Sequence, residues 1–287
     1  MNTTTSLRTA LILGLVGLTA LLSSAQAATL GYWRFEDSPG FLNDSSGNGH
    51  NLTAEASAVQ AEIPATGNGS TFSNPIPLTS ASNVDLANLT GSKYLSASDS
   101  DDWTQSAFSL ELYFNAADIS DASSSIMVSH FDSGSNDRGW FLGIHRTSKL
   151  LQVAFSNDGQ TGAGHTEVID SPWAIDEDKD YFAAVVVDMT DTSADGITFY
   201  LQNLTDGGAL LSSNATHSLT SIHNSDAQFR IGNQISGNGN IFDGVVDEVR
   251  FSSGLLSESE LMAIPEPSTV VLMLGALATC GLFRRRR

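Results

Sequence analysis

Short segments that alternate between apolar and polar residues, separated by clusters of Gly, Asn, Asp and Ser, recur through most of this chain. Such alternation is typical of β-strands, because successive side chains of a strand point to opposite faces. We expect strands at residues 30–36, 93–98, 107–116, 125–131, 139–145, 150–156, 181–189, 197–203, 228–232 and 244–251. The only helix expected is short, at residues 258–263, where Ser257 and Glu260 have the spacing of a capping box. Strands without helical crossovers predict an all-β, antiparallel two-sheet sandwich.

The first 27 residues have the features of a secretory signal peptide. Arg8 is their only charged residue, residues 10–22 are apolar, and Ala25-Gln26-Ala27 forms an A-x-A cleavage site. We therefore expect cleavage between Ala27 and Ala28, which makes the body an exported protein.

The last residues form a different kind of segment. Pro265, Glu266 and Pro267 precede an apolar run at residues 269–283, and four arginines end the chain. As a helix this run would be about 22 Å long, against a bilayer core of about 30 Å, so it would span only marginally. The arginines would stay on the cytoplasmic side. The alternative interpretation is a hydrophobic C-terminus that packs on the body.

Residues 264–287 resemble the PEP-CTERM sorting signal of Gram-negative bacteria, which combines a Pro-Glu-Pro motif, a short transmembrane helix and a basic end. The resemblance implies transient anchoring in the inner membrane and processing at Pro265, Glu266 and Pro267 by an exosortase-type enzyme. It also implies a final location at the cell surface or in the extracellular matrix, in bacteria that make exopolysaccharide.

The charge balance excludes some partners. The chain has 13 basic and 32 acidic residues, a net charge of −19, and removal of both ends leaves about −23 on the body. This charge argues against nucleic acid or an anionic membrane surface as the partner. Cys280, the only cysteine, lies in the tail, so the body has no disulfide and depends on an apolar core, with a metal as a further stabiliser.

Two segments of the body carry a family resemblance. Residues 31–36 with 44–50, and residues 242–251 with 255–257, resemble the opening and closing strands of LamG-like, concanavalin A-type jelly rolls. The resemblance covers about residues 30–262 and implies one jelly-roll domain at residues 28–263. It says little about activity, because this fold hosts lectins, adhesion modules, glycosidases and lyases.

The same resemblance implies a structural calcium ion where the first and last strands meet. Calcium prefers six to eight oxygen ligands. Asp247 and Glu36 would be its main carboxylate ligands, with Asp44 and the carbonyl of Gly47 as further ones. In the alternative interpretation Asp44 caps its glycine-rich turn and Asp247 makes a local hydrogen bond.

No catalytic motif is recognisable, and we predict no catalytic residue. Glu111 stands alone in its strand, whereas Asp247 and Glu248 are adjacent and are expected on opposite faces, so no pair of carboxylates shares a face. There is no G-x-S-x-G motif, and the six histidines lack zinc-site spacing, although His130 and His145 fall on neighbouring predicted strands.

These observations favour a non-enzymatic protein of the extracellular polysaccharide layer that binds carbohydrate or acts in adhesion. Trp103, Trp140 and Trp173 are predicted near strand ends, where their rings could stack on sugars; alternatively they fill the core. Two other functions stay open: a purely structural matrix protein, and a divergent polysaccharide hydrolase or lyase.

Overall fold

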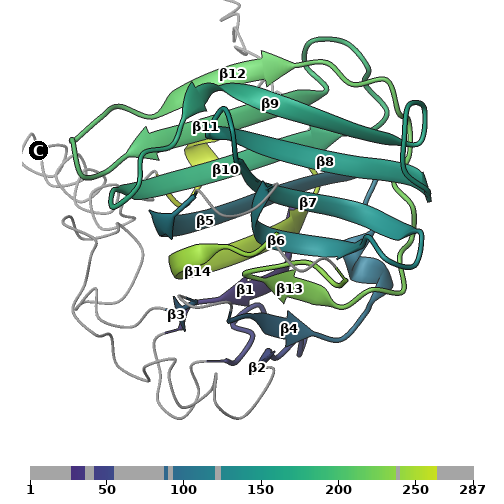
Figure 1. Cartoon of the computed structure of the whole chain (residues 1–287), viewed down its shortest axis with the longest axis horizontal. Helices are drawn as coiled ribbons and strands as arrows, with labels where there is room; N and C mark the ends of the chain where they lie inside the picture. Colours follow the sequence, from purple (N-terminus) through teal and green to yellow (C-terminus); the bar gives the residue numbers. More distant parts are fainter. Residues whose placement is uncertain are drawn as a thin grey trace, which may run out of the picture.

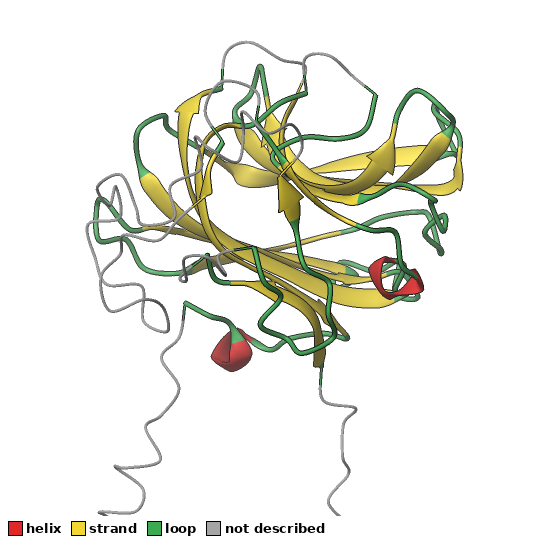
Figure 2. Cartoon of the chain, turned by 90° about the horizontal axis from the view of Figure 1, so that it is seen from below, coloured by secondary structure: helices red, strands yellow, loops and turns green. Residues whose placement is uncertain are grey.

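A computed structural model describes residues 27–35, 42–54, 87–89, 93–119, 124–236 and 240–263. In these ranges the chain forms two antiparallel sheets that pack face to face (Figures 1 and 2). The predicted signal peptide up to residue 26, the predicted ligand Glu36 and the predicted tail at 264–287 lie outside the described residues. No helix in the described part is long and apolar enough to cross a membrane.

The first sheet contains both ends of the body. Its order is β1 (Ala28–Trp33), β14 (Asp243–Ser253), β5 (Ala107–Asp118), β10 (Asp180–Asp188), β11 (Ile197–Asn203) and β12 (Leu211–Ala215), and β3 (Ala87–Asn88) also pairs with β14. The first strand therefore lies beside the last, as the family resemblance implies.

The second sheet lies in front of the first in Figure 1. Its order is β2 (Thr53–Ala54), β4 (Leu95–Ala97), β13 (Phe229–Ile231), β6 (Ser124–Asp132), β7 (Asp137–His145), β8 (Leu150–Gly159) and β9 (Thr166–Ala174). Two short 3₁₀ helices complete the described elements, η1 (Asp101–Trp103) and η2 (Glu258–Glu260).

Tryptophans fill the space between the sheets. Trp33, Trp103 and Trp140 are fully buried, and the Trp140 ring stacks on Phe251 with centroids 5.2 Å apart. The Trp140 indole N–H donates to the Trp103 carbonyl at 2.7 Å, which satisfies its buried donor. The idea that Trp103 and Trp140 stack on sugars is therefore wrong, and Trp173 is a partly buried residue that packs against the same core.

The outer face of the first sheet is also covered. The side chains of Tyr113, Phe182 and Ala184 form a second apolar cluster with Leu261 and Met262, which follow β14. Figure 2 shows the short helix η2 against this side of the sheet. This cover explains why residues 183–187 of β10 form a continuous apolar run, as expected for a strand buried on both faces.

Some elements differ from the sequence prediction. β9 and β12 are absent from the predicted set, because neither has a clean alternation of apolar and polar residues: Val168 and Leu211 are apolar but exposed. The expected helix at 258–263 is only the single turn η2, but the Ser257–Glu260 capping box is confirmed. His130 pairs with Trp140 and His145 with Ser124, so these two histidines lie far apart along the β6–β7 hairpin rather than together.

Candidate functional site: the outer face of the second sheet

The carboxylate of Asp44, one of the predicted calcium ligands, accepts hydrogen bonds from β1 and from the loop that follows Asp44. Its Oδ1 accepts the backbone N–H groups of Tyr32 at 3.0 Å and Ser46 at 2.8 Å. Its Oδ2 accepts the Ser46 hydroxyl at 2.7 Å and the His50 N–H at 3.0 Å. Burial alone would raise the pKa of Asp44, but these hydrogen bonds outweigh it and lower the pKa below the usual value. Asp44 thus ties the loop to β1.

Gly47 lies in the same loop with a φ of +90°. A side chain there would meet nothing within 4 Å, so the glycine serves the turn conformation and not a close approach. The geometry matches a glycine-rich turn closed by an aspartate.

Asp247 lies on the other side of β1 from Asp44. Residue Trp33 of β1 bridges to Asp44 on one side and pairs with Val249 of β14 on the other. The register between β14 and β5 shifts after Asp247, and Glu248 at this bulge has a φ of +46°. Asp247 pairs with Tyr113 of the outer face, and Glu248 accepts a hydrogen bond from Tyr32, which packs against the same apolar cluster as Tyr113. Because of the bulge both carboxylates lie on this face, and the expectation that they point to opposite faces is wrong.

Three of the buried carboxylates on the outer face of the first sheet lie near Tyr113, those of Glu111, Asp247 and Glu248. Glu248 accepts a hydrogen bond from the Tyr32 hydroxyl and lies 3.6 Å from Arg34, while Glu111 forms an ion pair with Arg250. Burial raises the pKa of Glu111 despite Arg250 and the hydrogen bond from the Met262 N–H. Met262 and its neighbours cover this group, so it stabilises the fold and is closed to a polysaccharide.

These positions fit a shared calcium ion poorly. The Asp44 oxygens already accept four donors, and β1 separates Asp44 from Asp247, a distance of about 10 Å for two strand spacings. Among the described residues no group of three His, Cys, Asp or Glu is arranged to hold a metal. Calcium binding with Glu36 as a ligand stays a prediction.

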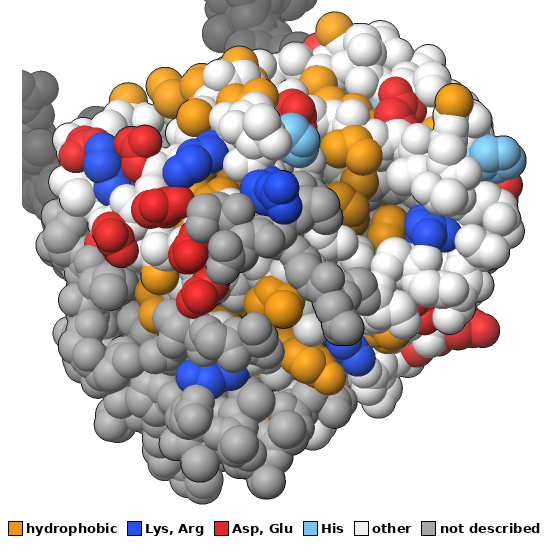
Figure 3. Space-filling view, viewed as in Figure 1, with side chains coloured by type: hydrophobic (Ala, Val, Ile, Leu, Met, Phe, Trp, Pro, Cys, Tyr) orange, Lys and Arg blue, Asp and Glu red, His pale blue; other side chains and the backbone are white. Residues whose placement is uncertain are grey.

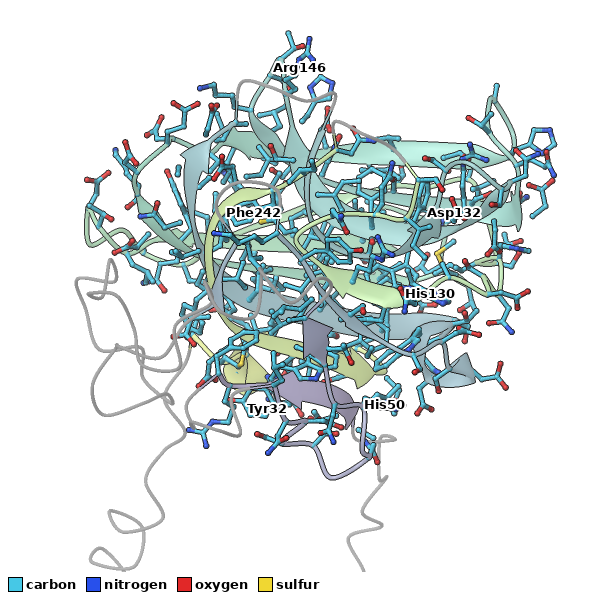
Figure 4. The ribbon with its side chains drawn as sticks, turned by 60° about the horizontal axis from the view of Figure 1, so that its bottom comes forward. Tyr32, His50, His130, Asp132, Arg146 and Phe242 are labelled. Carbon is cyan, nitrogen blue, oxygen red and sulfur yellow. The ribbon has the colours of Figure 1, made fainter. Side chains whose placement is uncertain are left out.

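Four histidines pair with aspartates in the loops at one end of the sandwich. The pairs, with their N–O distances, are His50–Asp102 (2.8 Å), His130–Asp99 (3.0 Å), His165–Asp158 (2.7 Å) and His223–Asp137 (3.0 Å). Figure 4 shows His50 near the purple strand β1, and His130 belongs to β6. Burial lowers the pKa of His130, although Asp99 acts in the opposite direction. These pairs bind loops to strands and form a structural network.

The outer face of the second sheet offers a different surface. Arg230 lies between the inward-facing Phe229 and Ile231 of β13, so its side chain points outward. Its guanidinium stacks on the Tyr94 ring, 4.3 Å from the centroid, and Nη2 donates to Gln228 Oε1 at 3.1 Å. The cross-strand neighbours of Arg230 are the small residues Ser96 and Ser129. The stacked pair is therefore partly exposed.

A second arginine lies on the same face at the start of β7. Arg138 lies above the Phe131 ring, and its Nη1 donates to Asn136 Oδ1 and to the Gly159 carbonyl, both at 3.1 Å. Asp132, before the same turn, directs its oxygens instead to the Gly134 N–H and the Ser135 hydroxyl. Arg138 thus has carbonyl and amide acceptors but no ion pair in the described part of the chain.

An apolar group lies on β6, β7 and β8 of the same face. It consists of Ile126, Phe131, Phe141 and Ala154, with the two phenylalanine rings edge to face at 5.3 Å. Figure 3 views the molecule from this side, with red carboxylates toward the left, at the top and at the lower right, and orange and blue side chains over the middle. We call Tyr94, Phe131, Arg138, Phe141 and Arg230 the arginine face.

Sequence reasoning missed Tyr94 and Arg230 because they are far apart in the chain and meet only where β4 pairs with β13. One signal was present. Arg230 alternates with two apolar residues in a predicted strand of a chain with only 13 basic residues. An arginine at an outward position of such a strand keeps its charged head at the surface.

The described residues form an all-β two-sheet sandwich with a polar and aromatic face on the second sheet. The profile of the concanavalin A-like lectin/glucanases superfamily (laminin G type 3) matches residues 89–262. The chain therefore belongs to this superfamily. No curated protein sequence matches the chain.

Three solved structures align with parts of this chain. Domain 4 of AbnA, an extracellular arabinanase of Geobacillus stearothermophilus solved with arabinotriose, has a TM-score of 0.50 and 16% identity over 82% of this chain and 96% of its own. A CBM40 of a Ruminococcus gnavus sialidase, bound to α2,3-sialyllactose, has a TM-score of 0.39 and 17% identity over 56% and 83%. For a botulinum neurotoxin type C structure the values are 0.49 and 15%, over 81% of this chain and half of the other.

Proposed function

We propose that this protein is an exported, non-catalytic carbohydrate-binding protein of the extracellular polysaccharide layer. The observation that carries the proposal is the Arg230–Tyr94 stack on the outer face of the second sheet. Tyrosine and arginine are enriched among the residues that carry most of the binding energy at protein interfaces. Membership of a superfamily that includes lectins supports the proposal, as does the arabinotriose-bound domain of similar fold.

Export and sorting complete the proposal. Strand β1 begins at Ala28, the residue that cleavage after Ala27 would leave first. The described body ends at Ala263, just before Pro265, Glu266 and Pro267, where an exosortase-type enzyme would act. The protein would then remain transiently in the inner membrane of a Gram-negative cell before release to the surface or matrix.

A glycan array tests the binding function. The purified protein should bind a subset of polysaccharides, and Tyr94→Ala should lower that binding at least tenfold. Leu211→Ala on β12 is the matched control, because Leu211 is exposed on the other sheet. Uniform absence of binding to every glycan would reject the function and favour a purely structural matrix protein.

Product analysis separates binding from catalysis. After prolonged incubation with the polysaccharides that bind, we expect neither new reducing ends nor unsaturated products. Either product would instead support a divergent hydrolase or lyase, in a superfamily whose description includes glucanases.

A further inference from the structure

The geometry points to an acidic ligand: the arginine face binds a uronic-acid polysaccharide, with Arg230 and Arg138 receiving its carboxylates. This inference rests on the proposed carbohydrate-binding function and names the class of its ligand. It depends on the hydrogen bonds and surroundings of the two arginines.

The first step is the lack of ion pairs. Several described cations are paired: Lys149 with Glu177, Lys179 with Asp176 and Asp206, and Arg250 with Glu111. In the same described ranges, Arg138 and Arg230 contact carbonyl oxygens, side-chain amides and aromatic rings, and neither contacts a carboxylate. The chain has 32 acidic residues, yet these two arginines on one face have no acidic partner among the described residues and are available for an external anion.

The second step is the unused capacity of Arg230. A guanidinium has five N–H donors. Arg230 contacts Asn233 Oδ1 and the Gln234 carbonyl only at 3.4 Å, and Gln228 Oε1 at 3.1 Å. Its Nε is buried and has no acceptor among the described residues, so an external carboxylate would be received by the N–H groups of Nη1 and Nη2. Stacking on Tyr94 holds the guanidinium plane in place, which favours bidentate recognition of a planar carboxylate.

The third step is the spacing of the two arginines. Arg230 is opposite Ser129 and Arg138 is opposite Phe131, on the two sides of β6. Strand geometry places their Cα atoms about 12 Å apart. A polymer that carries repeated carboxylates can contact both positions at once and gain affinity by effective concentration, which a single uronic acid cannot.

The net charge of the protein does not prevent this contact. At about 0.15 M salt the Debye length is about 8 Å, so repulsion between distant charges is screened while a direct ion pair is retained. The experiment is therefore done at physiological salt, with a chelator present to exclude bridging by divalent cations.

Native affinity electrophoresis tests the inference with matched polymers. The probes are polygalacturonate, alginate and hyaluronan, each compared with its carboxyl-reduced form, and dextran sulfate to separate carboxylate from sulfate. We expect at least one acidic polymer to bind tenfold or more tightly than its reduced form. Arg230→Gln and Arg138→Gln should each reduce this preference at least fivefold, whereas Arg146→Gln, at an exposed turn outside the face, should leave it unchanged.

The outcomes separate this inference from the proposed function. Equal binding of acidic and reduced polymers, or binding of neutral glycans alone, would overturn the acidic ligand and leave carbohydrate binding intact. Stronger binding of dextran sulfate that Arg230→Gln does not weaken would also overturn it. Absence of binding to all polymers and to the glycan array would reject both. Melting temperatures of the variants, expected within about 2 °C of the parent, show that a lost preference is not unfolding.

Discussion

The Glu111 carboxylate accepts the backbone N–H of Met262 at 2.8 Å, although 151 positions separate the two residues. Glu111 is one of three alternate residues of β5 that hold the segment after β14. Ser109 accepts the Leu256 N–H at 2.9 Å, and the Tyr113 hydroxyl donates to the Met262 carbonyl at 3.0 Å. The end of the body is therefore fixed to the outer face of the first sheet, just before the predicted sorting motif.

Glu111→Gln should destabilise the fold by about 3 kcal/mol, because it leaves Arg250 without its anionic partner in a buried place. The free energy of unfolding from urea titration measures the loss. Glu258→Gln, at an exposed position of η2, is the control and should cost less than about 0.5 kcal/mol. A loss below about 1 kcal/mol for Glu111→Gln would show that the segment is held by its apolar contacts alone.

Asp44→Asn should cost about 1–2 kcal/mol at pH 7, since an amide cannot replace both oxygens as acceptors for the loop. The hydrogen bonds lower the pKa of Asp44 below 3.8, so its contribution is present above that pH and is lost as the pH falls through the folded-state pKa. Unfolding curves at several pH values should show the difference between the two proteins narrowing below pH 4. A constant difference would mean that the charge of Asp44 is not involved.

The buried side chain of His130 should make the free energy of unfolding fall at acid pH. Burial lowers the pKa of His130 in the folded protein below 6.5. Above pH 6.5 the side chain is neutral in both the folded and the unfolded state. As the pH falls from 6.5 toward the folded-state pKa, the unfolded state binds a proton that the folded state does not, so the free energy of unfolding decreases. The parent should lose stability between pH 7 and 5, and His130→Gln should lose less. His145→Gln, at the far end of the hairpin, should follow the parent. Parallel curves for parent and His130→Gln would contradict the burial argument.

Calcium gives a separate test of the family-based metal site. Calcium at about a hundred times its dissociation constant should add roughly 2.7 kcal/mol to the free energy of unfolding. Glu36→Gln and Asp247→Ala should abolish the gain, while Asp44→Asn should preserve it, because Asp44 is already saturated with donors. The same melting temperature with calcium and with a chelator would contradict the predicted calcium site.

The strands with strong patterns could be predicted from sequence, and the polar ones could not. The range 197–203 matches β11 residue for residue, because its apolar and polar residues alternate cleanly. β12 carries Ser212, Ser213 and Asn214, and only pairing with β11 makes it a strand. The prediction that Asp247 and Glu248 point to opposite faces was wrong for a similar reason. A bulge depends on the register with β5, which the local sequence does not reveal.

The candidate site was less accessible to sequence reasoning than the fold. The tryptophans are prominent in the sequence, but Trp103 and Trp140 serve the core. The stack of Arg230 on Tyr94 forms only when β4 and β13 become neighbours, across a separation that no local pattern records. The turn role of Asp44, in contrast, was foreseeable from the glycines that follow it, and the structure confirms it.

Hydrogen–deuterium exchange with and without an acidic polysaccharide tests the central claim most directly. The account predicts slower exchange in β4, β13 and the β6–β7 hairpin, centred on Tyr94, Arg138 and Arg230, with no change in the segment that Glu111 holds. Protection confined to the first sheet or to the loops with the His–Asp pairs would contradict it, because the ligand would then bind away from the arginine face.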